Sequence, residues 1–403
     1  MVDFFDLVFS SSAIDFFIEQ TNLYAQQQAG EDWDCNTDIV EMRAFIGMLF
    51  FIGVHRLPEM NNYFSQSWVL STPEFSKRFT RRRWWQLWSN LHLADNTIPR
   101  PRPGQPGFNK LWKVQPLFDI LLADFQEKYY IGQNVSVDEM MVKGKGKNPV
   151  KQYLPMKPIK RGTKIWALGC SCCAYMYNMQ VYAGKVEGIV ENGLAYRVVT
   201  DLCEPHLSEF NNHVVYLDNF FTSIPLSRHL ESIGLHCVGT IRANRQEYPQ
   251  CLKDTVLLRN LQTGEFHTAA VGRHIMSVWK DTKVVSFITN VLSFFLYLVF
   301  NVVFNHEGYI ATITNVHPAK NNSTVTRKRK QDGTQTLRTS PSCVKDYNAN
   351  MGAIDRSDQM RQPYGIDRES KRWWIRIFLF MLDIAMVNSH VIYTQWFKTL
   401  QCP

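Results

Sequence analysis

The order of strand-like and helix-like segments between residues 132 and 243 restricts the fold of this chain more than any other feature. The expected segments are, in chain order, strands at 134–142, 164–172 and 175–182, a helix at 191–203, a strand at 213–218, a helix at 222–233 and a strand at 236–241. Short apolar strands that alternate with helices indicate parallel strands joined by crossovers, and the first three segments indicate an antiparallel meander. The sequence therefore predicts an α/β domain with a mixed sheet.

The order of these strands and helices is that of a ribonuclease-H-like core. Two acidic residues lie in strands that are neighbours in such a core. Asp138 lies in the first strand, and Asp218 ends the fourth strand, 80 positions later. These two strands lie side by side in such a core, so we expect the carboxylates to converge. Asp355 and Asp358 share a face if their segment is helical. Converging carboxylates bind hard cations, and two Mg²⁺ ions would support an in-line phosphoryl displacement.

Each acidic residue also has a simpler interpretation. An Asp at a strand end is often a turn or helix-capping residue, and Asp218 precedes a predicted helix closely enough to cap it. Asp138 with Glu139 is typical of a surface pair, and Asp355 with Asp358 of a solvated helix face. The catalytic interpretation depends on all three positions agreeing within one fold.

The residues before the predicted core, from 1 to about 131, have helical patterns. Thr37 is placed to cap a helix whose apolar positions include Ile39, Met42 and Ile46. The stretch 81–88 is a basic cluster that continues into an aromatic helix, and the four prolines within 99–107 predict a loop. Thr222 or Ser223 is the expected cap of the second core helix, and Gly234 follows its end.

Composition excludes some classes of protein. The chain of 403 residues is 45% hydrophobic and 13% aromatic, which is enough apolar surface for two or three hydrophobic cores and excludes general disorder. Lys and Arg exceed Asp and Glu by 8, a modest basic excess that suits a polyanionic partner. The nine Cys are irregularly spaced, and the Cys170–Cys173 cluster has no nearby His, so we expect small apolar strand residues there rather than a zinc site. Reduced thiols and the lack of a basic signal-like start favour an intracellular protein.

Several sequence blocks carry a family resemblance. They are residues 137–141, 151–158 and 162–166, residues 216–223 (YLDNFFTS), residues 239–245 (GTIRANR), and residues 344–360 with 371–374 (KRWW). With these blocks the chain resembles the transposases of the piggyBac family of cut-and-paste DNA elements. Weaker similarity, as in residues 45–47 and 91–96, extends it over most of the chain.

The resemblance implies an activity and its residues. The catalytic, metal-binding aspartates of the family fall on Asp138, Asp218 and Asp355, with Asp358 and Trp373 as accessory positions. It implies nicking of element ends, attack by the freed 3′-OH, hairpin intermediates and insertion at TTAA, with two Mg²⁺ ions or Mn²⁺ in their place. The expected partners are double-stranded DNA and a second copy of the chain, in the nucleus, with neither a membrane nor a small-molecule substrate.

The resemblance also implies a domain organisation. We expect a helical dimerisation and DNA-binding domain at 1–131, a ribonuclease-H-like core at 132–243, an insertion domain at 244–341, the core helix with the third Asp at 342–364, and a second, truncated helical part at 365–403.

Basic residues near these motifs are the expected DNA contacts. They are Lys143, Lys145, Lys147, Lys157, Lys160, Arg161, Arg242, Arg245, Lys371 and Arg372. Their position beside the acidic residues favours contacts with the phosphate backbone. The alternative is a solvated Lys/Gly loop that binds nothing. Residues 327–330 (RKRK) fit either a basic strand and turn or a nuclear localisation patch.

An uncharged run from 284 to 304 is long enough for a membrane span, but its flanks lack good anchoring residues. Family-like sequence lies on both sides of 291–315, and Thr-Asn at 289–290 recurs at 314–315. We therefore interpret 291–315 as inserted sequence, such as an unspliced intron; a buried strand pair in an enlarged insertion domain is the alternative.

From the comparison with the family pattern we expect two departures from active relatives, the lack of their acidic leader and of their Cys-rich, zinc-binding tail. The alternative to an active transposase is therefore a domesticated or defective copy that binds DNA or dimerises without cleaving.

Overall fold

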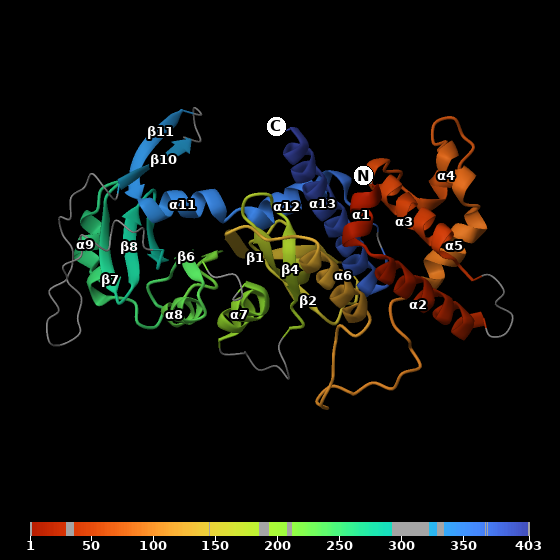
Figure 1. Ribbon diagram of the computed structural model, residues 1–403, viewed down its shortest axis with the longest axis horizontal. Coiled ribbons are helices and arrows are strands. Elements are labelled where there is room, and N and C mark those ends of the chain that lie inside the picture. Colours follow the sequence, from red (N-terminus) through yellow and green to blue (C-terminus); the bar gives the residue numbers. More distant parts are fainter. Residues whose placement is uncertain are drawn as a thin grey trace.

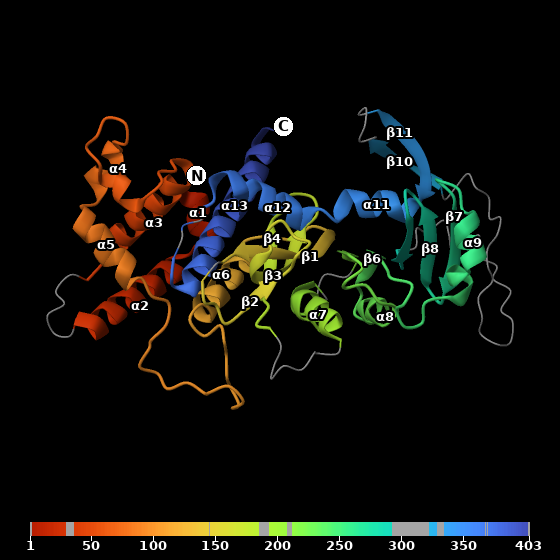
Figure 2. The same cartoon turned by 180° about the vertical axis from the view of Figure 1, so that it is seen from behind.

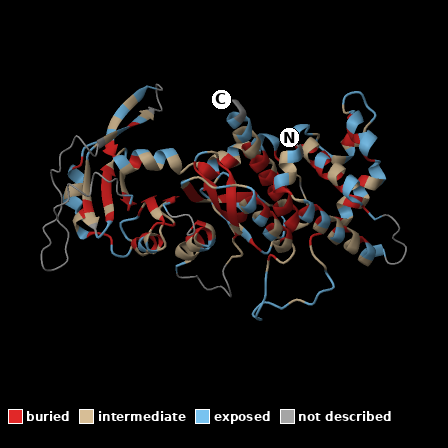
Figure 3. Cartoon of the chain, viewed as in Figure 1, coloured by how far each residue is buried: buried red, intermediate tan, exposed pale blue. Residues whose placement is uncertain are grey.

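The computed structural model describes residues 2–29, 36–144, 146–184, 193–207, 212–291, 322–328, 334–366, 368 and 370–401. The molecule is elongated, with a helical region at one end, a sheet in the middle and a group of β-hairpins at the other end (Figures 1 and 2). Buried residues concentrate in the central strands and in the long C-terminal helix, which marks where the largest core lies (Figure 3).

The central sheet has the strand order that the sequence predicts for the core. In the described part of the chain it contains nine strands in the order β2-β3-β1-β5-β6-β9-β8-β7, with β4 paired to β3. The strands are β1 Asn134–Lys143, β2 Lys151–Tyr153, β3 Arg161–Cys170, β4 Met176–Val181, β5 Val214–Leu217, β6 His236–Thr240, β7 Phe266–Val271, β8 His274–Lys280 and β9 Val284–Thr289. β1 is antiparallel to β3 and parallel to β5, and β5 is parallel to β6. The predicted mixed α/β core is confirmed, with β2 as a short strand that the pattern does not predict.

Helices connect and flank these strands. The core helices are α7 Leu194–Leu207, α8 Ile224–Ser232, α11 Ser342–Asn350 and α12 Ala353–Arg361. Ser223 is the residue that caps α8, because its hydroxyl accepts a hydrogen bond from Leu226 N, and Gly234 follows α8 with a φ of +82°. The predicted helix around Asp355 is two helices, α11 and α12, separated by a short break between Asn350 and Ala353.

The helical region is formed by both ends of the chain. Its helices are α1 Val2–Val8, α2 Ser11–Ala29, α3 Ile39–Val54, α4 Pro73–Arg78, α5 Arg81–Asn90, α6 Gln115–Glu127 and α13 Trp373–Gln401. The predicted cap at Thr37 is wrong by one residue. Asp38 caps α3 by accepting from Glu41 N, while Thr37 is buried and its backbone N–H donates to Asn22.

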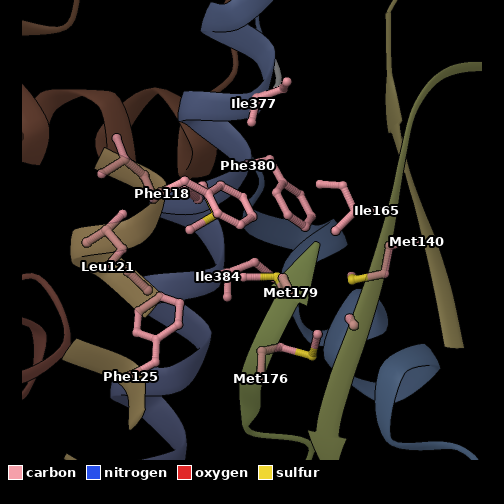
Figure 4. Close-up of a cluster of buried hydrophobic side chains, with 14 of the residues drawn as sticks. Phe118, Leu121, Phe125, Met140, Ile165, Met176, Met179, Ile377, Phe380 and Ile384 are labelled. Carbon is pink, nitrogen blue, oxygen red and sulfur yellow. The ribbon is translucent and has the colours of Figure 1, made fainter. Parts of the chain in front are cut away.

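The long helix α13 joins the helical region to the sheet. Asn388 in this helix hydrogen-bonds both backbone groups of Met176 on β4, at 2.8 and 2.9 Å. Apolar side chains from the helices α6 and α13 and from the strands β1, β3 and β4 pack together between the helical region and the sheet (Figure 4). In the described part of the chain one helix, Trp373–Thr399, is long and apolar enough to span a membrane, and most of its residues are buried, as in the core helix of a globular protein.

The region after β6 extends the same sheet. β9 pairs antiparallel with β6, so β7, β8 and β9 continue the central sheet beyond the core, above a second cluster of buried apolar residues. β10 (Asn322–Lys328) and β11 (Gln335–Pro341) form a hairpin in which Arg327 and Arg338 both bind Asp281. Asn290, directly after β9, is held against β6, since its side-chain oxygen accepts a hydrogen bond from Cys237 N at 2.6 Å. Of the segment 291–315 that we interpret as inserted sequence, residues 292–315 lie outside the described residues.

Candidate active site

Asp138 and Asp218 follow directly on the last paired residues of two adjacent parallel strands. Val137 on β1 is paired with Leu217 on β5, so the next residue of each strand is an aspartate. The Asp138 carboxylate accepts a hydrogen bond from Glu139 N at 2.7 Å. Because parallel strands present their carboxyl ends at one edge of a sheet, both aspartates lie at the same edge.

A tight turn fixes Asp218 after β5. The Asp218 carbonyl accepts hydrogen bonds from the Thr222 hydroxyl at 2.7 Å and from Phe221 N at 3.1 Å, and its carboxylate accepts from Phe220 N. The turn lies directly against Gly239 on β6, where a methyl group would be 2.5 Å from Thr222 Oγ1 and 2.8 Å from the Leu217 carbonyl. Only glycine fits there. Asp218 therefore shapes the turn, and it does not cap α8.

The helix α12 brings Asp355 to the same part of the sheet. It packs on β1 and β3, and its first residues fit against Gly169, where a methyl group would lie 3.0 Å from Ile354 Cδ1. Asp355 is in the first turn of α12 and is exposed. Lys157 lies near enough to Asp138 and Asp355 for its charge to interact with both.

The electrostatics of this edge reflect concentrated negative charge. Burial, with the nearby charges of Glu139 and Asp218, raises the pKa of Asp138 to about 7, although Lys157 and the hydrogen bond from Glu139 N oppose the shift. Glu139 forms ion pairs with Lys157 at 2.9 Å and Lys164 at 3.6 Å. Burial tends to lower the pKa of Lys157, yet its hydrogen bond to Glu139 and the surrounding acids leave that pKa raised.

Sequence patterns did not identify some members of this site. Burial raises the pKa of Tyr347 on α11 to about 12, and the charges of Asp218 and Asp138 contribute to the shift. Neighbouring Asp346 accepts a hydrogen bond from Tyr216 on β5 at 2.9 Å. Asp346 and Tyr347 lie within the family-like block 344–360. The sequence pattern of that block indicates only Asp355 and Asp358, which are three residues apart and share a helix face.

Three of the predicted site residues make their contacts within the protein. Asp358 accepts from Arg361 at 2.7 Å and from Gln362 at 3.0 Å. Arg242 Nε donates to Asn219 Oδ1 at 2.8 Å, and Arg245 Nη2 donates to the Asn219 carbonyl at 3.0 Å, so both arginines hold the turn after Asp218.

Arg372 also has an internal role. Its guanidinium donates to the carbonyls of Trp88, Ser89 and Leu91 at the end of α5 and lies over the rings of Trp88 and Trp374. It thereby fixes the start of α13 against α5. The neighbouring Lys371 is exposed.

Two of the remaining basic residues, Lys147 and Lys371, line a pocket of about 320 Å³. Its lining residues are Gly144, Gly146, Lys147, Asn148, Ser370, Lys371, Trp373 and Arg376. Trp373 is therefore in one pocket with residues from the loop that follows β1. Lys143, Lys160 and Arg161 are exposed near the same loop, and Lys145 lies outside the described residues.

The donor set of the acidic edge suits hard cations. Asp138, Asp218 and Asp355 offer carboxylate oxygens, the ligands that Mg²⁺ and Mn²⁺ prefer. The partly buried Asp138 is costly to ionise beside Asp218 and Glu139, and a bound divalent cation would offset that repulsion. The residues present therefore fit a divalent metal site.

Several known proteins are similar to this chain in sequence. A family model described as Transposase IS4 matches residues 2–390. The human PiggyBac transposable element-derived protein 3 is 26% identical over 391 residues, which cover 95% of this chain and 59% of that protein. The human PiggyBac transposable element-derived protein 2 is 24% identical, over 96% of this chain and 60% of that protein. The chain thus spans about three fifths of the length of these relatives.

The fold comparison agrees with the sequence comparison. The piggyBac transposase in a synaptic complex with hairpin DNA, solved by cryo-EM, superposes with a TM-score of 0.77 at 25% identity, covering 98% of this chain and 74% of that one. Sequence and structure lead to the same assignment: the chain belongs to the Transposase IS4 family and is of its piggyBac type.

Proposed function

We propose that this chain is a piggyBac-type transposase that cleaves DNA strands in a Mg²⁺-dependent reaction and transfers them to TTAA targets. The observation that carries the proposal is that Asp138 and Asp218 follow the paired residues Val137 and Leu217 of adjacent strands, while α12, which carries Asp355, packs on β1 and β3. Three acids that converge on a scissile phosphate would supply the ligands that in-line phosphoryl displacement requires.

The chain's own residues divide the work at this edge. Asp138, Asp218 and Asp355 would hold two Mg²⁺ ions, which when bound would activate the attacking oxygen and stabilise the leaving one. Glu139 holds Lys157 and Lys164 beside the acids. Lys157 is thereby placed to offset part of the negative charge of a scissile phosphate.

The DNA would lie along the basic surface beside the acids. Lys147 and Lys371 contribute cationic groups to the pocket that contains Trp373, and this combination suits a phosphate next to an unstacked base. We assign backbone contacts to these residues and to exposed Lys143, Lys160 and Arg161. Arg242, Arg245 and Arg372 have internal hydrogen bonds, and we assign them the positioning of neighbouring segments instead.

The second candidate function is DNA binding or dimerisation without cleavage. The observation that favours it is that the two human relatives are named as transposable element-derived proteins. A copy that has lost cleavage would keep the fold and the basic surface, so its DNA binding would not depend on the acids.

The deciding experiment measures strand cleavage on DNA with terminal repeats flanked by TTAA, in Mg²⁺, with wild type and Asp218→Asn. An amide at this position still accepts the hydrogen bond from Phe220 N but is a poor metal ligand, so the turn should survive and cleavage should disappear. Asp201→Asn is the matched control, because Asp201 forms a half-exposed pair with Arg197 on α7.

Three results are informative. Cleavage by wild type and by Asp201→Asn but not by Asp218→Asn supports the transposase. Salt-sensitive DNA binding by all three proteins without cleavage supports the second function. Equal cleavage by wild type and Asp218→Asn would contradict the proposed site.

Assembly and location extend the proposal. We propose that the chain acts as a homodimer on nuclear DNA, because transfer of an element requires its two ends to be held together. Mass measurement with and without DNA checks the dimer, and imaging of the tagged chain in cells checks the nucleus.

A further inference from the structure

The turn between β3 and β4 brings together sulfur atoms that the active site does not use. Cys170, Cys172 and Cys173 each offer an Sγ atom, and these atoms all lie within 4.8 Å of one another. Cys170 is buried, Cys173 is half-buried and Cys172 is exposed. The chain reverses here through Ala174, which has a φ of +66°, and this reversal turns neighbouring thiols toward a common point.

We propose that these three cysteines form a metal site that takes Zn²⁺ or a similar thiophilic cation. Thiolate sulfur prefers such cations, and carboxylate oxygen prefers Mg²⁺, so this site would select a different ion from the acidic edge. Zinc–sulfur bonds of about 2.3 Å in a tetrahedral site separate the sulfurs by roughly 3.7 Å. The three sulfurs lie within 4.8 Å of one another, and Cys170 and Cys172, whose sulfurs are 3.1 Å apart, need to separate by about 0.6 Å to admit the ion.

The surroundings support a small, asymmetric ligand cage. The hydroxyl of Tyr129 lies 3.0 Å from Cys173 Sγ and 3.8 Å from Cys170 Sγ, and Gln395 on α13 orients it through a hydrogen bond of 3.1 Å. Gly132 provides room for the sulfurs, since a methyl group there would lie 3.2 Å from Cys170 Sγ. The exposed side of Cys172 leaves a route for the ion and a place for water as fourth ligand.

This turn also holds the helix that carries Asp355. Ser171, between the first two cysteines, donates from its hydroxyl to the Asn350 carbonyl at 2.6 Å. Arg356, the residue after Asp355, donates to the Ser171 carbonyl. A metal that fixes the turn would therefore also fix the break between α11 and α12, and the site would be structural rather than catalytic.

The test uses the reduced, metal-free full chain, titrated with Co²⁺ and then with Zn²⁺, without DNA or Mg²⁺. Coordination by three thiols should release protons and give the intense absorption of thiolate-bound tetrahedral cobalt, at one ion per chain, which Zn²⁺ then removes. Zn²⁺ should also raise the melting temperature. Cys172→Ser, an exposed and conservative change, should lose the absorption and weaken binding by at least about tenfold.

The matched control is Cys251→Ser, which removes a thiol in the second hydrophobic cluster, outside the turn. It should bind like wild type. Cys173→Ser is a second ligand variant, and circular dichroism verifies that each variant is folded. The proposal is overturned if wild type gives no thiolate–cobalt absorption, or if folded Cys172→Ser and Cys173→Ser bind as wild type does. Because no DNA is present, these results do not depend on whether the chain cleaves.

Discussion

The acidic edge and the cysteine turn are two regions of the same strands and differ in almost every other respect. Both involve β1, β3 and α12. The acids come from three distant segments and offer hard oxygen, whereas the cysteines fall within four consecutive residues and offer soft sulfur. Strand order, which a sequence displays, brings the distant Asp138 and Asp218 to one edge, whereas the neighbouring cysteine sulfurs approach one another only through the folding of a single turn.

The largest expected effect separates the two regions by activity. Asp138→Asn should lower DNA cleavage by at least about 10³-fold, since losing a metal ligand forfeits several kcal/mol and each 1.4 kcal/mol is a factor of ten. The same change should leave the melting temperature of the metal-free protein equal or higher, because it removes a charge that burial disfavours. Cys172→Ser should abolish the effect of Zn²⁺ on melting and lower cleavage by less than about tenfold, because the turn supports α12 but contributes no ligand to the acidic edge. If Asp138→Asn abolished the effect of Zn²⁺ on melting, or if Cys172→Ser lowered cleavage as much as Asp138→Asn does, the two regions would not have separate roles.

The next effect tests the turn that holds Asp218. Gly239→Ala should destabilise the protein by roughly 1–3 kcal/mol, since the methyl group would overlap the Thr222 hydroxyl and the Leu217 carbonyl. Gly47→Ala in α3 is the control, because nothing lies within 4 Å of the added group, and alanine favours a helix by up to about 1 kcal/mol. Denaturant unfolding measures both. Equal destabilisation by the two variants would remove the steric explanation.

A smaller effect should reach both regions at once. Arg356→Gln removes the guanidinium that joins α12 to the Ser171 carbonyl, and should cost about 1–2 kcal/mol of unfolding free energy. It should weaken both cobalt binding and strand cleavage, because the turn and Asp355 lose a shared support. Arg273→Gln is the control, since its ion pair with Glu231 is mostly exposed and contributes at most about 1 kcal/mol. If Arg356→Gln alters one site alone, the proposed coupling is wrong.

The smallest expected effect is the loss of stability of the helical region at low pH, where His92 becomes protonated. Burial, the charge of Lys113 and then that of Arg372 lower the pKa of His92 to about 4 from 6.5, although a hydrogen bond to Asn96 opposes this. The folded state binds the proton less readily than the unfolded state. The stability contributed by neutral His92 is therefore full above pH 6.5 and falls away as the pH decreases toward 4.

The measurement is the melting temperature as a function of pH in wild type and His92→Phe. Phenylalanine keeps a ring beside Tyr24, on which His92 stacks at 3.9 Å, but it cannot titrate. The variant should lose less melting temperature than wild type between pH 6.5 and pH 4. Parallel curves would show that His92 does not contribute to the acid response.

How far the site was predictable depends on which forces place each residue. Asp138 and Asp218 could be located because the order of elements fixes which strands are neighbours, and the register then brings both carboxylates to one edge. The packing of Tyr347 against Phe287 and the ion pair between Lys164 and Glu139 could not be predicted, because both depend on which way a side chain turns in the packed structure. For Arg372 the basic motif predicts a DNA contact, and the structure adds hydrogen bonds to the end of α5 that no sequence pattern indicates.

The class of fold and the neighbouring strands of the core could be predicted from the residues, because periodicity and chain connectivity are local properties that a sequence displays directly. The choice of Asp355 as the third acid came from the family resemblance. The tertiary structure alone decided that both ends of the chain share one hydrophobic core through α13, that β9 extends the central sheet, and that Cys170, Cys172 and Cys173 point toward a common centre. These outcomes depend on contacts between residues far apart in the chain and on the direction of individual side chains, and packing fixes both only when the whole molecule is assembled.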